Sequence, residues 1–430
     1  MPATYELWLL DDAGKRITLF QNMAFFSYAR TVKGFGTILI GIPYRDFREQ
    51  VFPVFEPDRR VDVWRSAGTG IPLRWEGTYL LRMPKIYTRV TDNMQMISFY
   101  GRDAKDLLRR RVVIQAAGFP QTRKTDYIDD MMKEIVSEQM LYGSALDETG
   151  VVDNRRAWPE DEFLVQGEVS LGPSFTATFA DRKVLDVLKE LQDASFQLRE
   201  DNPLVNSKIY FDIIPFDAQG RIIYILDEET GTPMMGEMDG DFLLDEQSLE
   251  TSAEQGFMFV TFADLRGQDR TGSALIFSVE NNNIEAPRYI HDFMDEENSI
   301  IVKGFGRGDS RATEIVNDDQ RIAASRWNLC EGFEDASTEP DQDNLSDFGY
   351  ARLHEGRPKE DISAVFLNVP GSDDTPRSLY GVDWDLGDLL PVQYAEKRFS
   401  VEVTIVYVAV DDTGAETITG RSDIDASDQI

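Results

Sequence analysis

The first hundred residues alternate short apolar runs with turn-forming residues. Runs of about four to eight residues rich in β-branched and aromatic side chains, bounded by Gly, Asp and Asn, are typical of strands. Five such runs are present: Tyr5–Leu10, Ile17–Phe20, Thr37–Ile42, Val61–Trp64 and Met94–Tyr100. The pattern predicts a first β-domain, barrel-like or a sandwich, over residues 1–102.

The hydrophobic period changes between residues 103 and 205. Apolar residues there recur at the spacing that places them on one face of a helix. One stripe is Ile128, Met131, Met132, Ile135, Val136 and Met140, and the other is Val184, Leu185, Val187, Leu188, Leu191 and Leu198. We predict two amphipathic helices in a helical α/β insert, with the methionines facing its core. A methionine stripe also suits an adaptable binding surface, and that alternative stays open.

Strand-like runs return after Asn206. They are Lys208–Pro215, Arg221–Leu226, Gly256–Phe262 and Ser273–Val279. They predict a second β-module over residues 206–285, completed by residues 370–420. Residues 286–369 are expected to form an α+β segment. Its run Glu331–Asp347 is rich in Glu, Asp, Ser and Gly and favours an exposed acidic loop. Residues 421–430 are expected to form a flexible tail.

Three turns share one sequence pattern, Asp11–Gly14, Asp217–Gly220 and Asp411–Gly414. An Asp that opens a type I turn, with a Gly three positions later in the left-handed region, is what a hairpin of this length requires. The repeated turn suggests related β-modules towards the two ends of the chain.

The charge balance disfavours nucleic acids and anionic lipids as binding partners of the protein. The 430 residues include 77 Asp and Glu against 44 Lys and Arg, a formal net charge of −33. Such a field repels phosphate backbones and anionic lipids, which disfavours a surface that grips nucleic acid. Acidic walls suit a conduit that DNA passes without adhering, but composition alone favours simple solubility or a salty habitat as the reason for the charge. The sequence also has no apolar run of membrane-spanning length and no signal-peptide pattern at its start, so we expect no membrane-spanning segment.

Residues for catalysis or metal binding are scarce. The chain has two histidines, His291 and His354, and one cysteine, Cys330. Neither a Gly-x-Ser-x-Gly motif nor a His-Glu-x-x-His motif occurs, so a hydrolytic triad and a zinc peptidase lack support. The glycine cluster Lys303–Gly308 has its third glycine one position early for dinucleotide binding, which favours a tight turn or bulge. We therefore expect no catalytic residue, no cofactor and no metal ligand, although the many carboxylates leave a catalytic pair formally open.

Several segments spread along the chain carry further motifs. Arg30–Ile38 places a glycine-containing turn before an apolar strand, and Tyr100–Arg111 has a Gly-x-Asp…Leu-Leu-x-x-Arg pattern. They are followed by Gly267–Thr271, Ile276–Ser278, Asn281–Asn283, the glycines of Lys303–Gly308 and finally Tyr380–Leu390. Taken in this order, the segments resemble the tail-hub proteins of siphophages, which share a fold with the baseplate hub of contractile-tailed phages. Tyr380–Leu390 is the closest match, whereas Arg307, where the family often has an acid, and the acidic run after Cys330 depart from the pattern.

The resemblance implies an α+β, mainly β protein with two β-barrel-like modules joined by α/β segments. It implies a ring-forming homotrimer, with six similar modules around a central opening. The function would be a structural, non-enzymatic hub of the tail tip or baseplate, present in the virion and assembled in the host cytoplasm. Expected partners are the tail tube and distal tail proteins, tail fibre or receptor-binding proteins and the tape-measure protein, with transient passage of DNA without specific binding.

Two other functions stay open at this point. One is a secreted carbohydrate-binding or glycoside-cleaving β-protein, which would need aromatic platforms facing solvent. The other is the baseplate hub of a contractile injection system, which shares the hub fold and differs in its neighbours.

Overall fold

The computed structural model describes residues 3–11, 14–50, 56–68, 70–114, 122–141, 156–159, 162–179, 181–201, 207–217, 255–306, 311–336, 345–372 and 376–422. Within these residues the fold is mainly β with a smaller helical share, which confirms the predicted α+β class.

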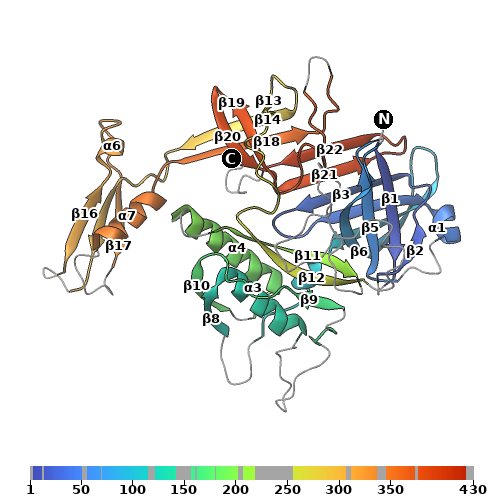
Figure 1. Ribbon diagram of the computed structural model, residues 1–430, viewed down its shortest axis with the longest axis horizontal. Helices are drawn as coiled ribbons and strands as arrows, with labels where there is room; N and C mark the ends of the chain where they lie inside the picture. Colours follow the sequence, from blue (N-terminus) through green and yellow to red (C-terminus); the bar gives the residue numbers. More distant parts are fainter. Residues whose placement is uncertain are drawn as a thin grey trace, which may run out of the picture.

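One large sheet dominates the molecule (Figure 1). In the described part of the chain it has 11 strands in the order β14-β18-β22-β21-β3-β4-β7-β6-β5-β1-β2, all paired antiparallel. Its N-terminal strands are β1 (Thr4–Leu10), β2 (Arg16–Leu19), β3 (Phe25–Thr31), β4 (Thr37–Pro43), β5 (Arg59–Ser66), β6 (Arg74–Thr88) and β7 (Gln95–Asp103), with helix α1 (Tyr44–Gln50) between β4 and β5. Its C-terminal strands are β14 (Ile284–Asp292), β18 (Lys359–Leu367), β21 (Ile405–Val410) and β22 (Glu416–Arg421).

Pairing between β21 and β3 joins the two ends of the chain in this sheet. Val408 lies opposite Tyr28, and Val406 lies opposite Arg30. Alternate residues of these strands face a shared core, in which Leu7, Ile40 and Phe99 are fully buried together with apolar residues of the C-terminal strands. A small sheet packs on the same core; its strands are β13 (Phe277–Ser278), β19 (Leu389–Tyr394) and β20 (Lys397–Glu402).

The α/β insert forms a second unit below the large sheet in Figure 1. Its elements are α2 (Asp106–Arg109), β8 (Thr122–Tyr127), α3 (Ile128–Val136), the π-helical turn η2 (Ser137–Leu141), β9 (Phe163–Val165), β10 (Ser174–Phe179), α4 (Val184–Asp201), β11 (Ile209–Asp217) and β12 (Gln255–Ala263). Both predicted helical stripes face its core, where only Leu198 stays partly exposed. The methionine stripe is therefore a core face and not an open binding surface.

Residues 293–358, here called the lobe, stand apart at the end of β14 and β18, at the left of Figure 1. The lobe contains β15 (Ser299–Lys303), β16 (Thr313–Asn317), α6 (Asp319–Ile322), β17 (Glu331–Asp335) and α7 (Leu345–Glu355). Its strands pair in the order β16-β15-β17, and α7 covers one face of them. After Lys303 the next described element is the antiparallel strand β16 and not a helix, and the Gly304 N–H donates to the Ala312 carbonyl at 3.0 Å. Arg307 and Gly308, the last residues of the glycine cluster, lie outside the described residues.

Two predictions need correction. The segment Glu331–Asp347 is not a loop throughout, because Glu331–Asp335 pairs in parallel with β15 and Leu345 begins α7. Arg421 closes β22 and does not belong to a tail. The acidic composition misled the prediction, because Glu331–Asp335 is held in the sheet by backbone pairing with β15 although three of its five residues are acidic.

The shared turn chemistry is confirmed at two of its three positions. Gly14 and Gly414 have φ of 80° and 78°, and each donates its N–H to the carbonyl of the opening Asp at 3.1 Å. The third turn, Asp217–Gly220, and the predicted strand Arg221–Leu226 extend outside the described residues.

Candidate functional site

Two of the sequence motifs that lie far apart in the chain meet in the structure. Gly267–Thr271 runs alongside the end of Tyr380–Leu390, with the Gly267 N–H donating to the Gly387 carbonyl at 3.2 Å. Asp388 accepts from the Gln268 N–H at 2.7 Å and from the Arg270 guanidinium at 2.6 Å. The two segments therefore form one paired unit, which we call the motif junction.

Glycine is required where the two segments touch. Gly387 has φ of 85°, a conformation that side chains rarely adopt. A Cβ at Gly387 would lie 2.8 Å from the Gly267 nitrogen, and a Cβ at Gly267 would overlap Asp388. Any larger residue would push the two segments apart.

Trp384 anchors the motif junction in the core of the large sheet. Its side chain is fully buried, and its indole N–H donates to the Ser378 carbonyl at 3.1 Å. The ring packs on Tyr380, with a centroid distance of 5.2 Å, and on Phe366. Buried indoles normally satisfy their N–H in this way, so the residue combines large apolar burial with a fixed orientation.

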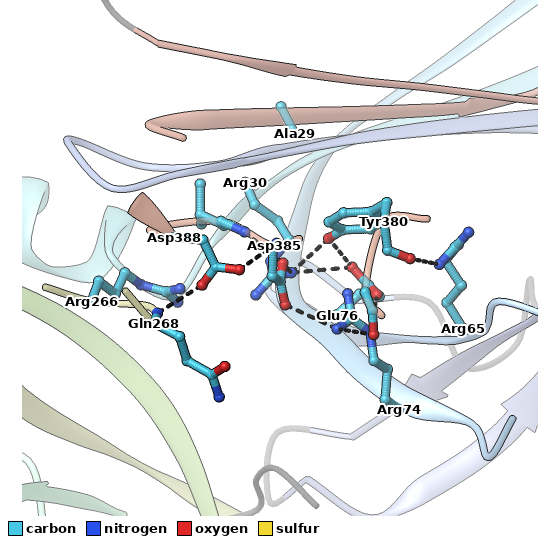
Figure 2. A network of polar contacts seen from close by, with 12 residues as sticks. Ala29, Arg30, Arg65, Arg74, Glu76, Arg266, Gln268, Tyr380, Asp385 and Asp388 are labelled. Carbon is cyan, nitrogen blue, oxygen red and sulfur yellow. Dashed lines mark hydrogen bonds and ion pairs between the residues drawn. The ribbon is translucent and has the colours of Figure 1, made fainter. Parts of the chain in front are cut away.

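Tyr380, whose ring packs on Trp384, belongs to a buried network of charges. Figure 2 shows this network. Arg30 of β3 lies 3.2 Å from Glu76 and 2.9 Å from Asp385. Arg74 of β6 lies 2.8 Å from Glu76 and 2.9 Å from Asp385. The Tyr380 hydroxyl accepts a hydrogen bond from Arg30 at 2.6 Å and donates one to Glu76. Two cations and two carboxylates thus surround one hydroxyl, and they tie the N-terminal strands to the Tyr380–Leu390 segment.

A second set of contacts extends the network to β1, β5 and β22. The buried Arg65 guanidinium holds both carboxylate oxygens of Glu416 at 3.0 Å and donates to the Tyr380 carbonyl at 3.0 Å. The Tyr5 hydroxyl donates to the same Glu416 carboxylate. Glu416 follows the Asp411–Gly414 turn, so this contact fixes the C-terminal hairpin against the first strand.

Electrostatics keep the network charged despite its burial. Burial alone would raise the pKa of Asp385, but the Arg74 and Arg30 guanidiniums hold it well below its usual range. Burial raises the pKa of the Tyr380 hydroxyl, so this group stays protonated and keeps donating to Glu76. Burial also raises the pKa of Asp388, against the opposing effect of Arg270.

Another polar junction fixes the α/β insert to the large sheet. Lys105 donates to the Thr31 carbonyl at 2.7 Å and lies 3.7 Å from Asp103 and 3.6 Å from Asp212 of β11. Burial, opposed by Lys105, raises the pKa of Asp103 to about 6. The pKa of Asp212 is lowered because Lys105 and Arg266 outweigh its burial. Lys105 lies in the Tyr100–Arg111 segment, whose role in this structure is to join the first β-strands to the insert.

The comparisons with known proteins give weak likenesses. No family model matches the chain, and no curated protein matches its sequence. Among solved structures, a tail protein from Neisseria meningitidis MC58 is 9% identical with a TM-score of 0.45, covering 98% of this chain and 97% of that one. A 43 kDa tail protein of prophage MuSo2 from Shewanella oneidensis is 11% identical with a TM-score of 0.44, covering 97% and 98%. A prophage tail protein from Listeria monocytogenes EGD-e is 7% identical with a TM-score of 0.44, covering 98% and 96%. Likenesses of this degree assign neither a family nor a function.

The carboxylates of the buried network are each held by arginines, which leaves no unpaired acid there to transfer a proton. His291 lies on the exposed side of β14, 3.7 Å from Glu360, and its ring packs on Phe293. No group of three or more His, Cys, Asp and Glu that could hold a metal ion occurs in the described ranges. No helix among the described residues is long and apolar enough to cross a membrane.

Sequence reasoning named the segments of this site but missed its partners. Glu76 and Arg74 lie in β6, which the sequence pattern did not mark as a strand, and Arg65 and Glu416 carry no motif. The one available signal was the charged residues inside otherwise apolar strands, at positions such as Glu76 where a core residue would be expected.

Proposed function

We propose that the chain is a structural, non-enzymatic hub of a phage tail tip or baseplate that assembles as a ring-shaped homotrimer. The observation that carries the proposal is the motif junction. Gly267–Thr271 and Tyr380–Leu390 are the segments whose sequences resemble the tail-hub family most closely. Independent motifs of chance origin have no reason to pair with each other, whereas two parts of one inherited structural unit do.

The geometry of the motif junction suits a rigid structural element. It fixes strands from both ends of the chain to one core through paired charges and a fully buried tryptophan. Buried networks of paired charges favour one rigid arrangement, since a shift leaves a charge unpaired in a low dielectric. A hub that seats other tail components requires such rigidity.

The proposed partners follow from this role. The hub would connect the tail tube and distal tail proteins to tail fibre or receptor-binding proteins, with the tape-measure protein inside the tube. DNA would pass the ring without specific binding. The charge of −33 favours this passage because it leaves few cationic sites for phosphates to bind. The protein would reside at the tail tip of the virion after assembly in the host cytoplasm.

The large sheet offers poor support for the carbohydrate-binding alternative. Trp8, Trp64 and Trp75 gather on its outer face, as a glycan platform would require. However, Trp64 is 5% exposed, and the Arg16 guanidinium lies 4.6 Å from the Trp8 ring centre and 5.6 Å from that of Trp64. Arg16 therefore lies over the rings of Trp8 and Trp64, and Trp64 is buried, which disfavours these two rings as a platform for a sugar.

Assembly is the direct test of this proposal. Mass photometry of the purified protein and cryo-EM of tail tips are expected to show a ring of three copies. An isolated monomer or a ring of six copies in the virion would contradict it. Zymography and reducing-sugar assays on host envelopes are expected to show no cleavage, and activity lost on changing one specific carboxylate would overturn the non-enzymatic assignment.

A further inference from the structure

The second half of β6 is an edge of the large sheet. The strand is buried from Glu76 to Leu81 and becomes exposed at Arg82, where a bulge shifts its register against β7. From Met83 to Thr88 it pairs with β7 alone, because its pairing with β5 ends at Leu81. Among the described residues, no strand pairs with the outer edge of this half. Residues 82–95, here called the β6–β7 arm, therefore form an exposed sheet edge and the turn that follows it.

The arm is apolar as well as exposed. The exposed fractions are 55% for Met83, 53% for Ile86, 94% for Val90 and 42% for Met94. An unpaired strand edge with exposed large apolar side chains is a template for pairing with another chain, unless charges or a proline block it. Pro84 and Lys85 disfavour non-specific pairing of this edge with other strands. A partner of this edge must therefore match its side chains.

The charge of the arm differs in sign from that of the whole protein. It carries Arg82, Lys85 and Arg89 against one carboxylate, Asp92, in a chain with net charge −33. Within the chain, Arg82 lies beside Asp58, and Arg89 lies beside Asp92 and, at 3.9 Å, Asp412; even so, 52% and 29% of the two arginine side chains stay exposed. Lys85 lies over the Tyr87 ring at 5.9 Å. The surface that best complements this cationic, apolar arm is an acidic one, and the chain itself supplies it in excess.

We propose that the β6–β7 arm docks on the acidic surface of a second copy of this chain. The inference rests on the proposed ring and names the element that makes its contact. A heterologous contact, in which the arm of one copy meets a different surface of the next, closes into a ring without a twofold axis. Apolar residues of the arm would supply the buried area, and its cations would set the register and speed the encounter. An anionic membrane is a poorer occupant, because the other surfaces of the protein would be repelled from it.

Reversing the charge of Lys85 tests the electrostatic contribution of the arm to self-association. Lys85→Glu is expected to weaken self-association by about ten-fold or more in low salt, measured by sedimentation and mass photometry on the full chain. Lys15→Glu makes the same change on an exposed turn of the same sheet and is expected to leave self-association unchanged. Ile86→Ser is expected to weaken association as well, with Val169→Ser as its control, since Val169 is 52% exposed outside the arm. Equal effects of test and control variants would overturn the inference.

Crosslinking identifies what the arm touches. Val90→Cys in a Cys330→Ser background gives a single thiol in the turn of the arm. A thiol-reactive benzophenone is attached to this cysteine. Irradiation of the purified protein is expected to give multimers whose crosslinked peptides pair the arm with an acidic segment of the same sequence. Multimers that form without crosslinks from the arm would reject this interface and leave the hub proposal intact. If arm-mediated multimers form while tail particles lack the protein, the hub proposal fails and the interface stands. Crosslinks to added anionic vesicles in place of a second copy would also overturn the inference.

Discussion

The large sheet and the lobe are both built from strands with apolar inner faces, yet they are stabilised in different ways. The core of the large sheet draws on both ends of the chain and includes Trp384, Tyr380 and Phe366. The core of the lobe is far smaller and consists of Ile300, Val302, Val316, Ala336, Leu345 and Leu353. Because stabilisation grows with apolar area buried, the lobe must rely more on polar contacts.

Those polar contacts lie at the base of the lobe. Asn298 is fully buried; its oxygen accepts from the Cys330 N–H at 2.9 Å and its nitrogen donates to the Asn328 carbonyl at 2.8 Å. Arg352 holds both oxygens of Glu297 at 2.8 and 3.1 Å, at the edge of a cavity of about 160 Å³. The face of the lobe sheet away from α7 meanwhile exposes 57% of Ile315 and 56% of Phe333. The lobe should therefore open locally at a lower free energy than the large sheet.

The largest difference is expected from two tryptophans. Trp384→Ala removes a fully buried ring from the large sheet and should lower the free energy of unfolding by about 3 to 5 kcal/mol. Trp327→Ala in the lobe removes a side chain that is 82% exposed and should change it by less than about 0.5 kcal/mol. Denaturant unfolding of both variants measures the two values. Similar losses of unfolding free energy in the two variants would show that Trp327 contributes as much to stability as the buried Trp384, against the difference in their burial.

The next effect concerns paired charges. Asp385→Asn leaves Glu76 as the one carboxylate of the network beside Arg30 and Arg74, at a cost of about 2 kcal/mol near pH 7, a figure reduced because 25% of the Asp385 side chain is exposed. The pKa of Asp385 is depressed in the folded state, so its contribution is present above the unfolded value of 3.8 and is lost as pH falls below it. Asp335→Asn in the lobe, whose side chain is 55% exposed, is the control and should cost little. Because the folded-state pKa of Asp385 is lower still, part of the cost remains at pH 2, and a cost that is as large at pH 2 as at pH 7 would contradict this account.

A local effect is expected at the base of the lobe. Asn298→Ala leaves the Cys330 N–H and the Asn328 carbonyl without their partner, which should lower the opening free energy of the lobe by about 2 kcal/mol. Hydrogen exchange should speed up at the Ile300 and Val302 amides while β3 and β4 keep their protection. Asn317→Ala, on an exposed position of β16, is the matched control. Equal acceleration in the large sheet would show that the two regions unfold together.

The smallest expected effect comes from Asp62, a buried carboxylate whose pKa is raised, in contrast to the lowered pKa of Asp385. Burial raises the pKa of Asp62 to about 6 from 3.8. The folded state therefore binds more protons than the unfolded state between about pH 4 and 6, and the protein loses stability as pH rises through that window. Asp62→Asn should flatten this dependence and stabilise the protein by about 1 kcal/mol at pH 8, since Asn still accepts from Thr78. Asp193→Asn, at an exposed position, should change neither; thermal unfolding across pH 4 to 8 checks both variants.

Local patterns in the sequence determined the elements whose stability is local. The helical stripes of α3 and α4 follow from spacing alone, because one face of a helix must be apolar to pack. The turns at Asp11 and Asp411 follow from the conformational freedom of Gly14 and Gly414. The second half of β6 escaped detection because both its faces are exposed, so that no alternation marks it. The strand β17 escaped because three of its five residues are acidic, and its place in the sheet depends on backbone pairing with β15.

Only the tertiary structure decided which distant segments meet. Nothing in the sequence near Arg30 shows that β3 pairs with β21, or that Glu76 and Asp385 will share its charge. The Gly267–Thr271 and Tyr380–Leu390 segments were recognisable separately, but their contact became visible only in the fold. The physical reason is that periodicity and turn chemistry act over a few residues, whereas strand pairing and buried charge compensation depend on which surfaces the whole chain brings together.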